Sequence, residues 1–536
     1  MEFGSSFEAI CRAMERPGFY RHPVRRLQRI DTHISTVFLT GDWVYKLKKP
    51  VDFGFLDFRE LEARRRFCEQ EVRLNQRLSR GVYDGVVEIR LDDSGALSLG
   101  GPGEVVEYAV RMRQLPRSAN LVPLLENRKV AGAEMQTLGE KLAAFYALSR
   151  RNPEIDRYGS PEVVGFNTEE NFRQVAPFVG NWVEAERWEF IREVSRTFFS
   201  NHRELFERRV LEGRIRDGHG DLRAEHIYFD RGVQIIDCIE FNDRFRYGDA
   251  AADLAFLHMD LERMGRSDLS GALLAAYVGK SEDGGLYALI DFYAAYRSIV
   301  KLKVACLRST ETDSEEELRD LRSAVAEYLG HAYRYAVQFG RPALWVFCGL
   351  PASGKSYLAE ETARALSLRL FQSDRIRKEL AGLPEDREEV VPYNRGLYRQ
   401  ELRGRVYGHM LALAQEQLKN GRSAALDASF SRRRWREEAS RLAADLDTNV
   451  FFIECICSEE RLRERLAARE TGHGASDARL QHLPRMIREF EPLEEASPDA
   501  RLKIDTERPR SESMVELLSG AYRLKRLQVA RKLQAM

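Results

Sequence analysis

The sequence has little of what marks secreted, membrane-bound or disulfide-stabilised proteins. No apolar run reaches the roughly 20 residues that a membrane-spanning helix needs, and the first residues do not form a charged-then-apolar signal segment. The seven cysteines among 536 residues lack the spacing of a disulfide framework or a zinc site. We therefore expect a cytoplasmic protein with reduced thiols and no membrane partner.

An excess of charge of one sign is also missing. Lys plus Arg and Asp plus Glu number 84 each, so the formal net charge is zero. No broad basic track for nucleic acid is evident, which favours a small substrate and is compatible with a short anionic one. The 43% hydrophobic and 31% charged content is typical of a globular protein, and 536 residues exceed one ordinary core.

The first 340 residues read as strands followed by helices. Apolar alternation on both sides of Gly41 and Asp42 predicts a hairpin over residues 37–48. The further predicted elements are a helix over 58–78, strands over 86–91, 97–99 and 105–113, mainly helices from 131, and a strand–loop–strand unit over 215–237. This order predicts an α+β domain.

From residue 341 strands and helices alternate. The breaker Gly340, Arg341 and Pro342 precedes this region. Strands are predicted over 343–348, 368–372, 423–427, 449–456 and 501–505, with helices between them. Such alternation predicts an α/β domain with a parallel sheet and helices on both faces. We expect domains over 1–340 and 341–510, and a C-terminal helical tail over 511–536.

The strongest functional signal lies between the first of these strands and its helix. The loop consists of Gly349, Leu350, Pro351, Ala352, Ser353, Gly354, Lys355 and Ser356. Its glycines let backbone N–H groups face phosphates, and the helix N-terminus adds partial positive charge. Lys355 would reach the β- and γ-phosphates and Ser356 a Mg²⁺ ion. A purely structural turn is the alternative, but the complete pattern favours an ATP site, with GTP not distinguished.

A second phosphotransfer site is indicated in the first 340 residues. The block from His219 through Gly220 and Asp221 to His226, followed by Asp237 after a short hairpin, resembles the catalytic and metal-binding loops of the aminoglycoside phosphotransferase and protein-kinase-like superfamily. The resemblance implies a bilobal α+β kinase-like fold. It also implies that Asp221 orients or deprotonates the acceptor hydroxyl and that Asp237 holds Mg²⁺ against the phosphates.

The strand lysine and its helix partner of that superfamily also have counterparts. Lys46 would contact the phosphates and Glu71 would pair with it. Lys48 lies on the same face of the strand as Lys46, because successive strand side chains point to opposite faces. Either lysine could therefore contact the phosphates, and we select Lys46. Glu71 lies on a helix rich in charge, and a solvated ion pair is the alternative. Asp253 matches the superfamily's loop-bracing aspartate.

His226 departs from the superfamily, which usually has Asn there as the second metal ligand. Imidazole suits Mg²⁺ less well than an amide oxygen. Glu225 or Glu240 could replace it, a single metal could suffice, or this site could bind without turnover.

The end of the second predicted strand resembles the zeta-toxin, polynucleotide-kinase and gluconate-kinase branch of P-loop kinases. That resemblance makes Asp374 the base for the acceptor hydroxyl and Arg377 the clamp for the acceptor's anionic group. An N-cap role for Asp374 is the alternative. Asp427 ends the third strand and would bind Mg²⁺ through water or brace the loop.

A predicted helix over 458–469 resembles the mobile lid of these kinases. Arg465 and Arg469 are spaced by four on one helix face and would contact the substrate's phosphate, with plain solvation as the alternative. Gly472 and Gly474 would act as hinges. The arginines from Arg432 to Arg436 are predicted to coat a solvated helix face or, less well, to touch substrate.

Segments 31–51, 237–246 and 296–304 look like bacterial bifunctional aminoglycoside phosphotransferase-like/ATP-binding proteins. We therefore predict an ATP- and Mg²⁺-dependent kinase acting on a hydroxyl of a small molecule or nucleotide. One alternative is a polynucleotide 5′-kinase that acts on a nucleic-acid end. The other is an ATP-binding regulatory or toxin-like protein with an inactive first domain. The acceptors, any coupling between sites and the oligomeric state are not readable from the sequence.

Overall fold

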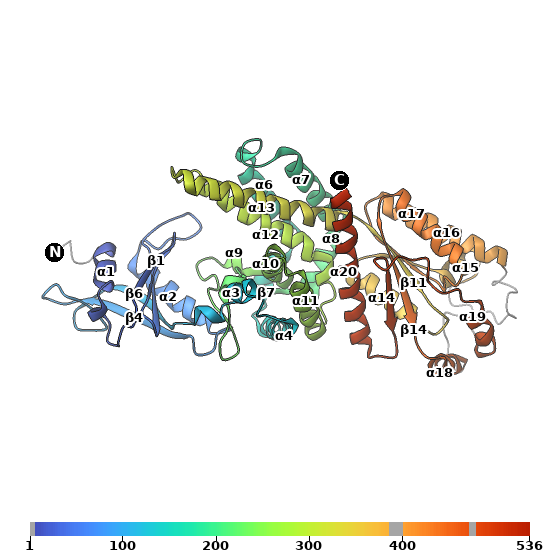
Figure 1. The fold of residues 1–536 in the computed structure, drawn as a ribbon, viewed down its shortest axis with the longest axis horizontal. Coiled ribbons are helices and arrows are strands. Elements are labelled where there is room, and N and C mark those ends of the chain that lie inside the picture. Colours follow the sequence, from blue (N-terminus) through green and yellow to red (C-terminus); the bar gives the residue numbers. More distant parts are fainter. Residues whose placement is uncertain (1–5, 385–399, 471–478, 536) are drawn as a thin grey trace. The chain divides into compact units, whose positions relative to one another are not determined.

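The computed structural model describes residues 6–384, 400–470 and 479–535 (Figure 1). The chain forms two compact units: unit 1 comprises residues 1–159 and 210–270, and unit 2 comprises residues 160–209 and 271–536. The chain passes from one unit to the other three times: between Gly159 and Ser160, within the helix α8 (Arg203–Leu211) and within the helix α11 (Ser267–Ser281).

Unit 1 begins with a six-stranded antiparallel sheet in the order β1-β2-β3-β6-β4-β5. Its strands are β1 (Gln28–Asp31), β2 (Ser35–Leu39), β3 (Trp43–Lys48), β4 (Tyr83–Leu91), β5 (Leu97–Leu99) and β6 (Glu104–Arg113). The predicted hairpin over 37–48 is confirmed, with Val37 opposite Lys46. The helix α1 (Phe7–Met14) and strand β1 were not predicted; α1 packs its apolar face on the sheet through Ile10 and Met14.

The predicted helix after the hairpin is α2 (Leu61–Asn75), which packs against β4 and β6. The rest of unit 1 contains α3 (Leu121–Glu126), α4 (Gly132–Leu148), α5 (Pro153–Asp156), α9 (Asp243–Arg246) and α10 (Ala250–Arg263). Two small antiparallel pairs join β7 (Ile215–Asp217) to β10 (Tyr247–Asp249) and β8 (Ile227–Phe229) to β9 (Val233–Ile235). The predicted strand–loop–strand unit over 215–237 contains β7, β8 and β9, but β7 pairs with β10, which lies outside that range.

Unit 2 combines long helices with a parallel sheet. The helices before the sheet are α6 (Pro161–Val175), α7 (Ala185–Asn201), α12 (Leu286–Arg308) and α13 (Glu315–Gly340), together with parts of α8 and α11. The five-stranded sheet has the order β12-β13-β11-β14-β15, and all four pairings are parallel. The predicted parallel α/β architecture is therefore confirmed.

The predicted strands and helices of this region follow their expected ranges to within about two residues, as helix boundaries do in general, whereas α19 was not predicted. The strands are β11 (Ala343–Cys348), β12 (Arg369–Gln372), β13 (Ala424–Asp427), β14 (Asn449–Ile456) and β15 (Arg501–Asp505). The helices are α14 (Lys355–Leu366), α15 (Ser373–Leu380), α16 (Gln400–Lys419), α17 (Arg433–Asp445), α18 (Glu459–Glu470), α19 (Leu483–Glu489) and α20 (Arg510–Ala535). The predicted domain limits stay predictions; α20, the predicted tail, packs against β14 and β15.

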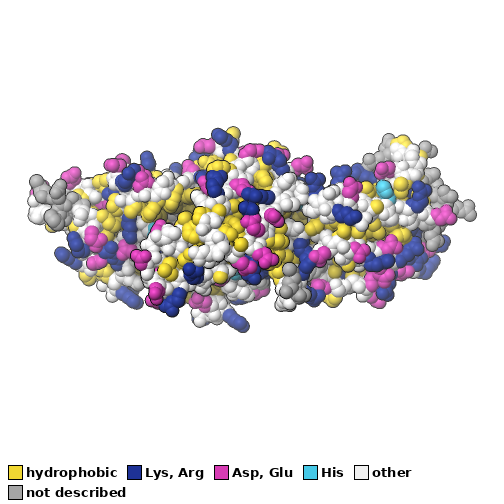
Figure 2. All heavy atoms as spheres, turned by 90° about the horizontal axis from the view of Figure 1, so that it is seen from above, with side chains coloured by type: hydrophobic (Ala, Val, Ile, Leu, Met, Phe, Trp, Pro, Cys, Tyr) yellow, Lys and Arg dark blue, Asp and Glu magenta, His cyan; other side chains and the backbone are white. Residues whose placement is uncertain are grey.

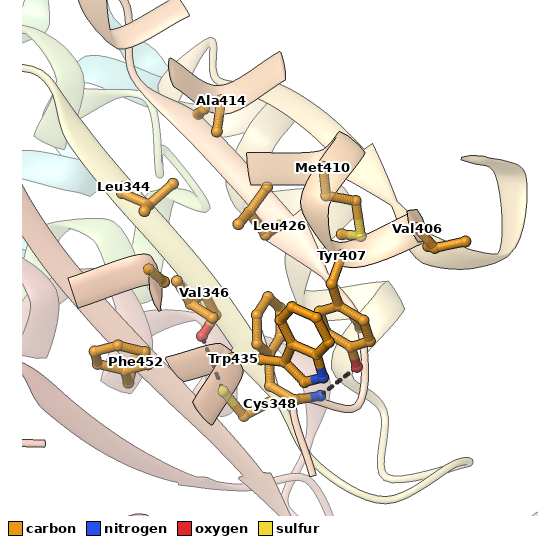
Figure 3. Packing of buried hydrophobic residues seen from close by; sticks show 14 of the residues in the cluster. Leu344, Val346, Cys348, Val406, Tyr407, Met410, Ala414, Leu426, Trp435 and Phe452 are labelled. Carbon is orange, nitrogen blue, oxygen red and sulfur yellow. Dashed lines mark hydrogen bonds between the residues drawn. The ribbon is translucent and has the colours of Figure 1, made fainter. Parts of the chain in front are cut away.

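One face of the parallel sheet is buried beneath α16 and α17 (Figure 3). Alternate residues of β11, such as Leu344 and Val346, point into this core because successive strand side chains face opposite sides. Tyr407 of α16 stacks on Trp435 of α17 with ring centroids 4.9 Å apart. The Tyr407 hydroxyl accepts the backbone N–H of Phe430, which fixes the loop after β13 (Figure 3).

The surface carries both signs of charge. Figure 2 shows basic and acidic side chains interspersed over the face that it presents. Among the described residues, no helix combines the length and the apolar character that crossing a bilayer demands.

The prediction of a solvated face for Arg432–Arg436 is wrong for Arg436. Its side chain is fully buried. It donates to the carbonyls of Phe430 (2.7 Å) and Pro492 (2.9 Å) and forms an ion pair with Glu495. The helix period places Arg436 on the inner face, where these acceptors compensate for lost hydration.

Replacing Arg436 with alanine should lower the free energy of unfolding by about 3–5 kcal/mol, because the Glu495 carboxylate, whose side chain is 9% exposed, and the carbonyls that Arg436 serves lose their partner. Urea denaturation followed by circular dichroism would measure this. Arg433→Ala on the same helix is the control, since the exposed Arg433 only pairs with Glu437, and it should change stability little. Equal effects of the two substitutions would contradict a structural role for Arg436.

Candidate functional sites

The phosphate loop of unit 2 has the backbone that its glycines predict. Gly349 follows β11 with φ 145°, and Gly354 precedes α14 with φ 87°. A Cβ atom at Gly349 would lie 2.6 Å from the Cys455 carbonyl oxygen and 2.7 Å from Ser353 Oγ. Only glycine is free of this clash, so the tight turn that opens α14 depends on it. The helix N-terminus therefore lies at the end of this loop, where it adds partial positive charge.

The residues expected to bind Mg²⁺ in unit 2 follow two neighbouring strands. Asp427 ends β13 directly beside β11, and Ser356 lies in the first turn of α14, after the loop that follows β11. Gln372 Nε2 donates to Asp427 Oδ2 at 3.2 Å. Asp427 Oδ1 is buried and has no hydrogen-bond partner among the described residues.

The charge state of Asp427 reflects this environment. Burial raises the pKa of Asp427, while the Lys355 ammonium and the Ser356 hydroxyl act to lower it. A buried carboxylate oxygen without a partner, next to a hydroxyl, is an all-oxygen donor set of the kind that Mg²⁺ prefers. The residues present therefore fit a Mg²⁺ ion, which would neutralise phosphate charge at this place.

Asp374 lies in the first turn of α15, beyond the end of β12. The N-cap of α15 is Gln372, which makes no side-chain capping bond, so the N-cap alternative for Asp374 is wrong. Arg377, one turn later, is buried and forms an ion pair with Asp374. The structure thus brings the expected base and the expected clamp together, and an anionic acceptor would compete with Asp374 for Arg377.

Arg465 of α18 is tied to the phosphate loop. It donates to the Ala352 carbonyl at 3.2 Å, and to the carbonyl (2.7 Å) and hydroxyl (3.2 Å) of Thr506. Simple solvation of Arg465 is therefore excluded. The side chain of Arg469 lies outside the described part of the chain, as do Gly472 and Gly474, so the predictions for these residues stay predictions.

A pocket beside the phosphate loop was missed in the sequence. Its volume is about 330 Å³, and its walls include Gly354, Tyr357, Arg465, Arg508 and Arg510. The Arg510 guanidinium lies over the Tyr357 ring, 4.4 Å from its centroid. The signal that could have located it is the segment after β15, because the carboxyl ends of parallel strands share one edge of the sheet.

In unit 1 two lysines and one glutamate form a buried network. Glu71 of α2 is fully buried and contacts Lys46 Nζ at 2.9 Å and Lys48 Nζ at 2.8 Å. Lys46 Nζ also lies 2.6 Å from Asp237 Oδ1, whereas Lys48 pairs with Glu240. A solvated ion pair is excluded. The contact with Asp237 distinguishes Lys46 from Lys48 and agrees with its selection from the sequence.

The electrostatics of this network keep it charged. Burial acts to lower the pKa of Lys46, but the carboxylates of Asp237 and Glu71 outweigh it and raise that pKa well above its usual value. Burial likewise acts to raise the pKa of Asp237, but the Lys46 ammonium and the His226 ring outweigh it and hold that pKa well below its usual range. The site therefore presents an ionised carboxylate at Asp237.

The loop residues converge on Asp237, which has a strained left-handed backbone with φ 64°. His226 Nε2 lies 3.6 Å from Asp237 Oδ2 and 3.8 Å from Glu225 Oε1. His226 Nδ1 is 2.9 Å from the Asp221 carbonyl oxygen. In the described ranges, no group of three His, Cys, Asp or Glu side chains could hold a metal ion without other ligands.

Asp253 braces the loop that carries Asp221. Its carboxylate accepts the backbone N–H of His219 (2.6 Å) and Gly220 (2.8 Å), and the hydroxyl of Tyr146 (3.0 Å). All four groups are buried. This agrees with the bracing role that the resemblance implies.

Asp253→Ala should lower the free energy of unfolding by about 3 kcal/mol, because it leaves buried N–H donors without an acceptor. Urea denaturation of the full chain would measure the loss. Asp253→Asn, which retains one acceptor oxygen, should lose less, and the exposed Asp93→Ala should lose little. An unchanged midpoint in Asp253→Ala would contradict the brace.

Taken together, these folds and sites define a chain of two kinase-type phosphotransferase domains, one protein-kinase-like and one of the P-loop type. The family model described as "Phosphotransferase enzyme family" matches residues 41–297, and the model described as "AAA domain" matches residues 344–493.

Uncharacterized proteins of Mycobacterium tuberculosis and Mycobacterium bovis are 33% identical to this chain over 499 residues, covering 92% of it and 95% of each relative. The chain belongs to the same family as these mycobacterial proteins.

Two solved structures are similar to this chain over a share of its length. A gluconokinase from Sinorhizobium meliloti is 22% identical, with a TM-score of 0.27, over 36% of this chain and 98% of its own. The GDP complex of aminoglycoside 2′-phosphotransferase-IIIa is 13% identical, with a TM-score of 0.37, over 61% of this chain and 99% of its own.

Proposed function

We propose that the protein is an ATP-dependent kinase with two nucleotide sites. The P-loop domain transfers the γ-phosphate of ATP to a hydroxyl of a small molecule or nucleotide, and the kinase-like domain phosphorylates or binds a small metabolite. The observation that carries the proposal is the buried Asp427 Oδ1, which has no hydrogen-bond partner among the described residues and lies at the end of β13 beside the glycine-bounded loop. A carboxylate oxygen at this place is what a nucleotide·Mg²⁺ site of a P-loop kinase requires.

In the P-loop domain, phosphate binding, metal binding and proton transfer are assigned to different residues. Backbone N–H groups of the loop and the Lys355 ammonium would hold the phosphates, and Ser356 and Asp427 would hold Mg²⁺. Asp374 would accept the acceptor's proton, and Arg377 would bind an anionic group on the acceptor. Arg465 would keep α18 against the loop so that water is excluded during transfer.

In the kinase-like domain Lys46 would contact the phosphates while Glu71 fixes its position. Asp221 would orient the acceptor hydroxyl and receive its proton, and Asp237 would hold the metal ion. The contacts of Lys46 with Glu71 and Asp237 support this assignment, since these three groups must lie together for phosphoryl transfer.

A screen of a metabolite extract with γ-labelled ATP and mass spectrometry tests the proposal. Wild type should label at least one acceptor, and Lys355→Ala and Asp221→Asn should each remove the product of one site. Adding 5′-hydroxyl oligonucleotides to the assay tests the polynucleotide-kinase alternative. The mixed surface charge in Figure 2 favours a small acceptor over a nucleic-acid end. ATP binding without transfer to any acceptor would instead favour the regulatory alternative.

A further inference from the structure

The kinase-like site differs from an all-oxygen metal site in one donor, His226. The ring lies in the short 3₁₀ turn Ala224–His226, between the catalytic loop and β8 (Ile227–Phe229). It is largely buried, with 9% of its surface exposed, so its orientation is set by the protein and not by solvent.

The hydrogen bond of Nδ1 determines which nitrogen can bind a metal. Nδ1 of His226 lies 2.9 Å from the Asp221 carbonyl oxygen. A carbonyl oxygen can only accept, so Nδ1 carries the proton and donates it. In the neutral ring Nε2 therefore has a free lone pair, and a hydrogen bond at the other nitrogen is the usual way in which a ligating histidine is oriented.

That lone pair lies where the metal would be. Nε2 is 3.6 Å from Asp237 Oδ2, the expected metal ligand. Two ligand atoms that each lie about 2.1 Å from one ion are about 3.0 Å apart when the ligand–metal–ligand angle is 90°, and farther apart when that angle is wider. One ion could therefore bind both His226 Nε2 and Asp237 Oδ2 with little movement of the two side chains. Glu225 Oε1, 3.8 Å from Nε2, is also paired with Arg223.

The other candidate for a replacement ligand is already engaged. The Glu240 carboxylate is buried against Lys48 Nζ. His219, the second imidazole of the loop, directs Nε2 to the Ile236 carbonyl at 3.0 Å and accepts the Asp221 N–H at Nδ1. Of the described imidazoles at this loop, His226 is therefore the one with a nitrogen directed toward Asp237.

From this juxtaposition we propose that the kinase-like site binds Mn²⁺, or a similar divalent first-row transition ion, in preference to Mg²⁺. His226 Nε2 and Asp237 would coordinate this ion. The P-loop site would bind Mg²⁺. The proposal rests on the nucleotide site proposed above. Mg²⁺ demands oxygen ligands and yields its water reluctantly, whereas Mn²⁺ accepts carboxylate and phosphate oxygens and binds imidazole more readily. The contrasting all-oxygen pair, Ser356 and Asp427, lies in the same chain.

The test uses the full chain with Lys355→Ala, which disables nucleotide binding at the P-loop, and the β,γ-methylene analogue of ATP. Pulsed electron paramagnetic resonance with Mn²⁺ should show ¹⁴N coupling from a directly bound imidazole. The coupling should change to the ¹⁵N pattern in protein labelled with ¹⁵N-histidine, and it should vanish in His226→Asn. The exposed His33→Asn is the matched control and should leave it unchanged.

Calorimetric titration of the same proteins gives the second readout. His226→Asn should lower the ratio of Mn²⁺ to Mg²⁺ affinity about tenfold. Nucleotide-dependent binding of both ions with no nitrogen coupling and an unchanged ratio in His226→Asn would overturn the metal assignment alone. Failure of the protein to bind the nucleotide analogue with either ion would overturn the nucleotide site as well.

Discussion

Replacing Lys355 with alanine should reduce γ-phosphate transfer by the P-loop domain by about 10²- to 10³-fold. The ammonium lies at the start of α14, where it would meet the charge that develops on the transferred phosphoryl group. Neither the loop's N–H groups nor a bound Mg²⁺ can replace a positive charge at that point. Single-turnover measurement with γ-labelled ATP on the labelled acceptor would report the loss.

Lys419→Ala provides the matched control, because this lysine is exposed at the end of α16 in the same domain. It removes one positive charge without touching the loop, and its rate should equal that of wild type. Wild-type rates in Lys355→Ala would mean that this loop is not where ATP reacts. The proposed P-loop kinase would then be untenable.

Asp221→Asn should lower transfer by the kinase-like domain by about 10²- to 10⁴-fold. Asparagine keeps the size of the side chain and its backbone carbonyl, which accepts from His226, but it cannot take the acceptor's proton. Nucleotide binding should persist, since Lys46 and Asp237 remain in contact. Product formation and equilibrium nucleotide binding measured in parallel separate the two effects.

Asp93→Asn serves as the control in the same unit, because Asp93 is exposed in the turn between β4 and β5. The regulatory alternative makes the opposite prediction for Asp221→Asn. If the first domain only binds nucleotide, the substitution should be silent in every transfer assay. A silent Asp221→Asn together with active wild type would therefore assign all turnover to the P-loop domain.

Much of the fold was predictable because the periodicity of the sequence is clear. The continuous apolar run of β11 and the glycines that follow it predicted both the strand and the phosphate loop. The order of short strands and helices after residue 341 then implied a parallel sheet, which the structure confirms. The short helix α1 and strand β1 were missed, since α1 is defined by its contacts with the sheet as much as by its own sequence.

The site was predictable in its residue types but not in its pairings. Period-two alternation could not separate Lys46 from Lys48, since both face α2; the contact with Asp237, 191 positions away, distinguishes them. Arg436 was misjudged because an arginine-rich run looks solvated until its buried acceptors are known. The pocket wall formed by Tyr357 and Arg510 was not predicted, because these residues belong to no local sequence motif.

By itself, then, the sequence determined the two kinds of phosphotransfer machinery and the order in which they occur, because glycine turns, helix starts and strand periods are local properties of the chain. Only the tertiary structure decided which charges are buried together and which nitrogen of His226 faces Asp237. Those choices depend on the loss of water around groups that are far apart in the chain, and no local pattern records that loss.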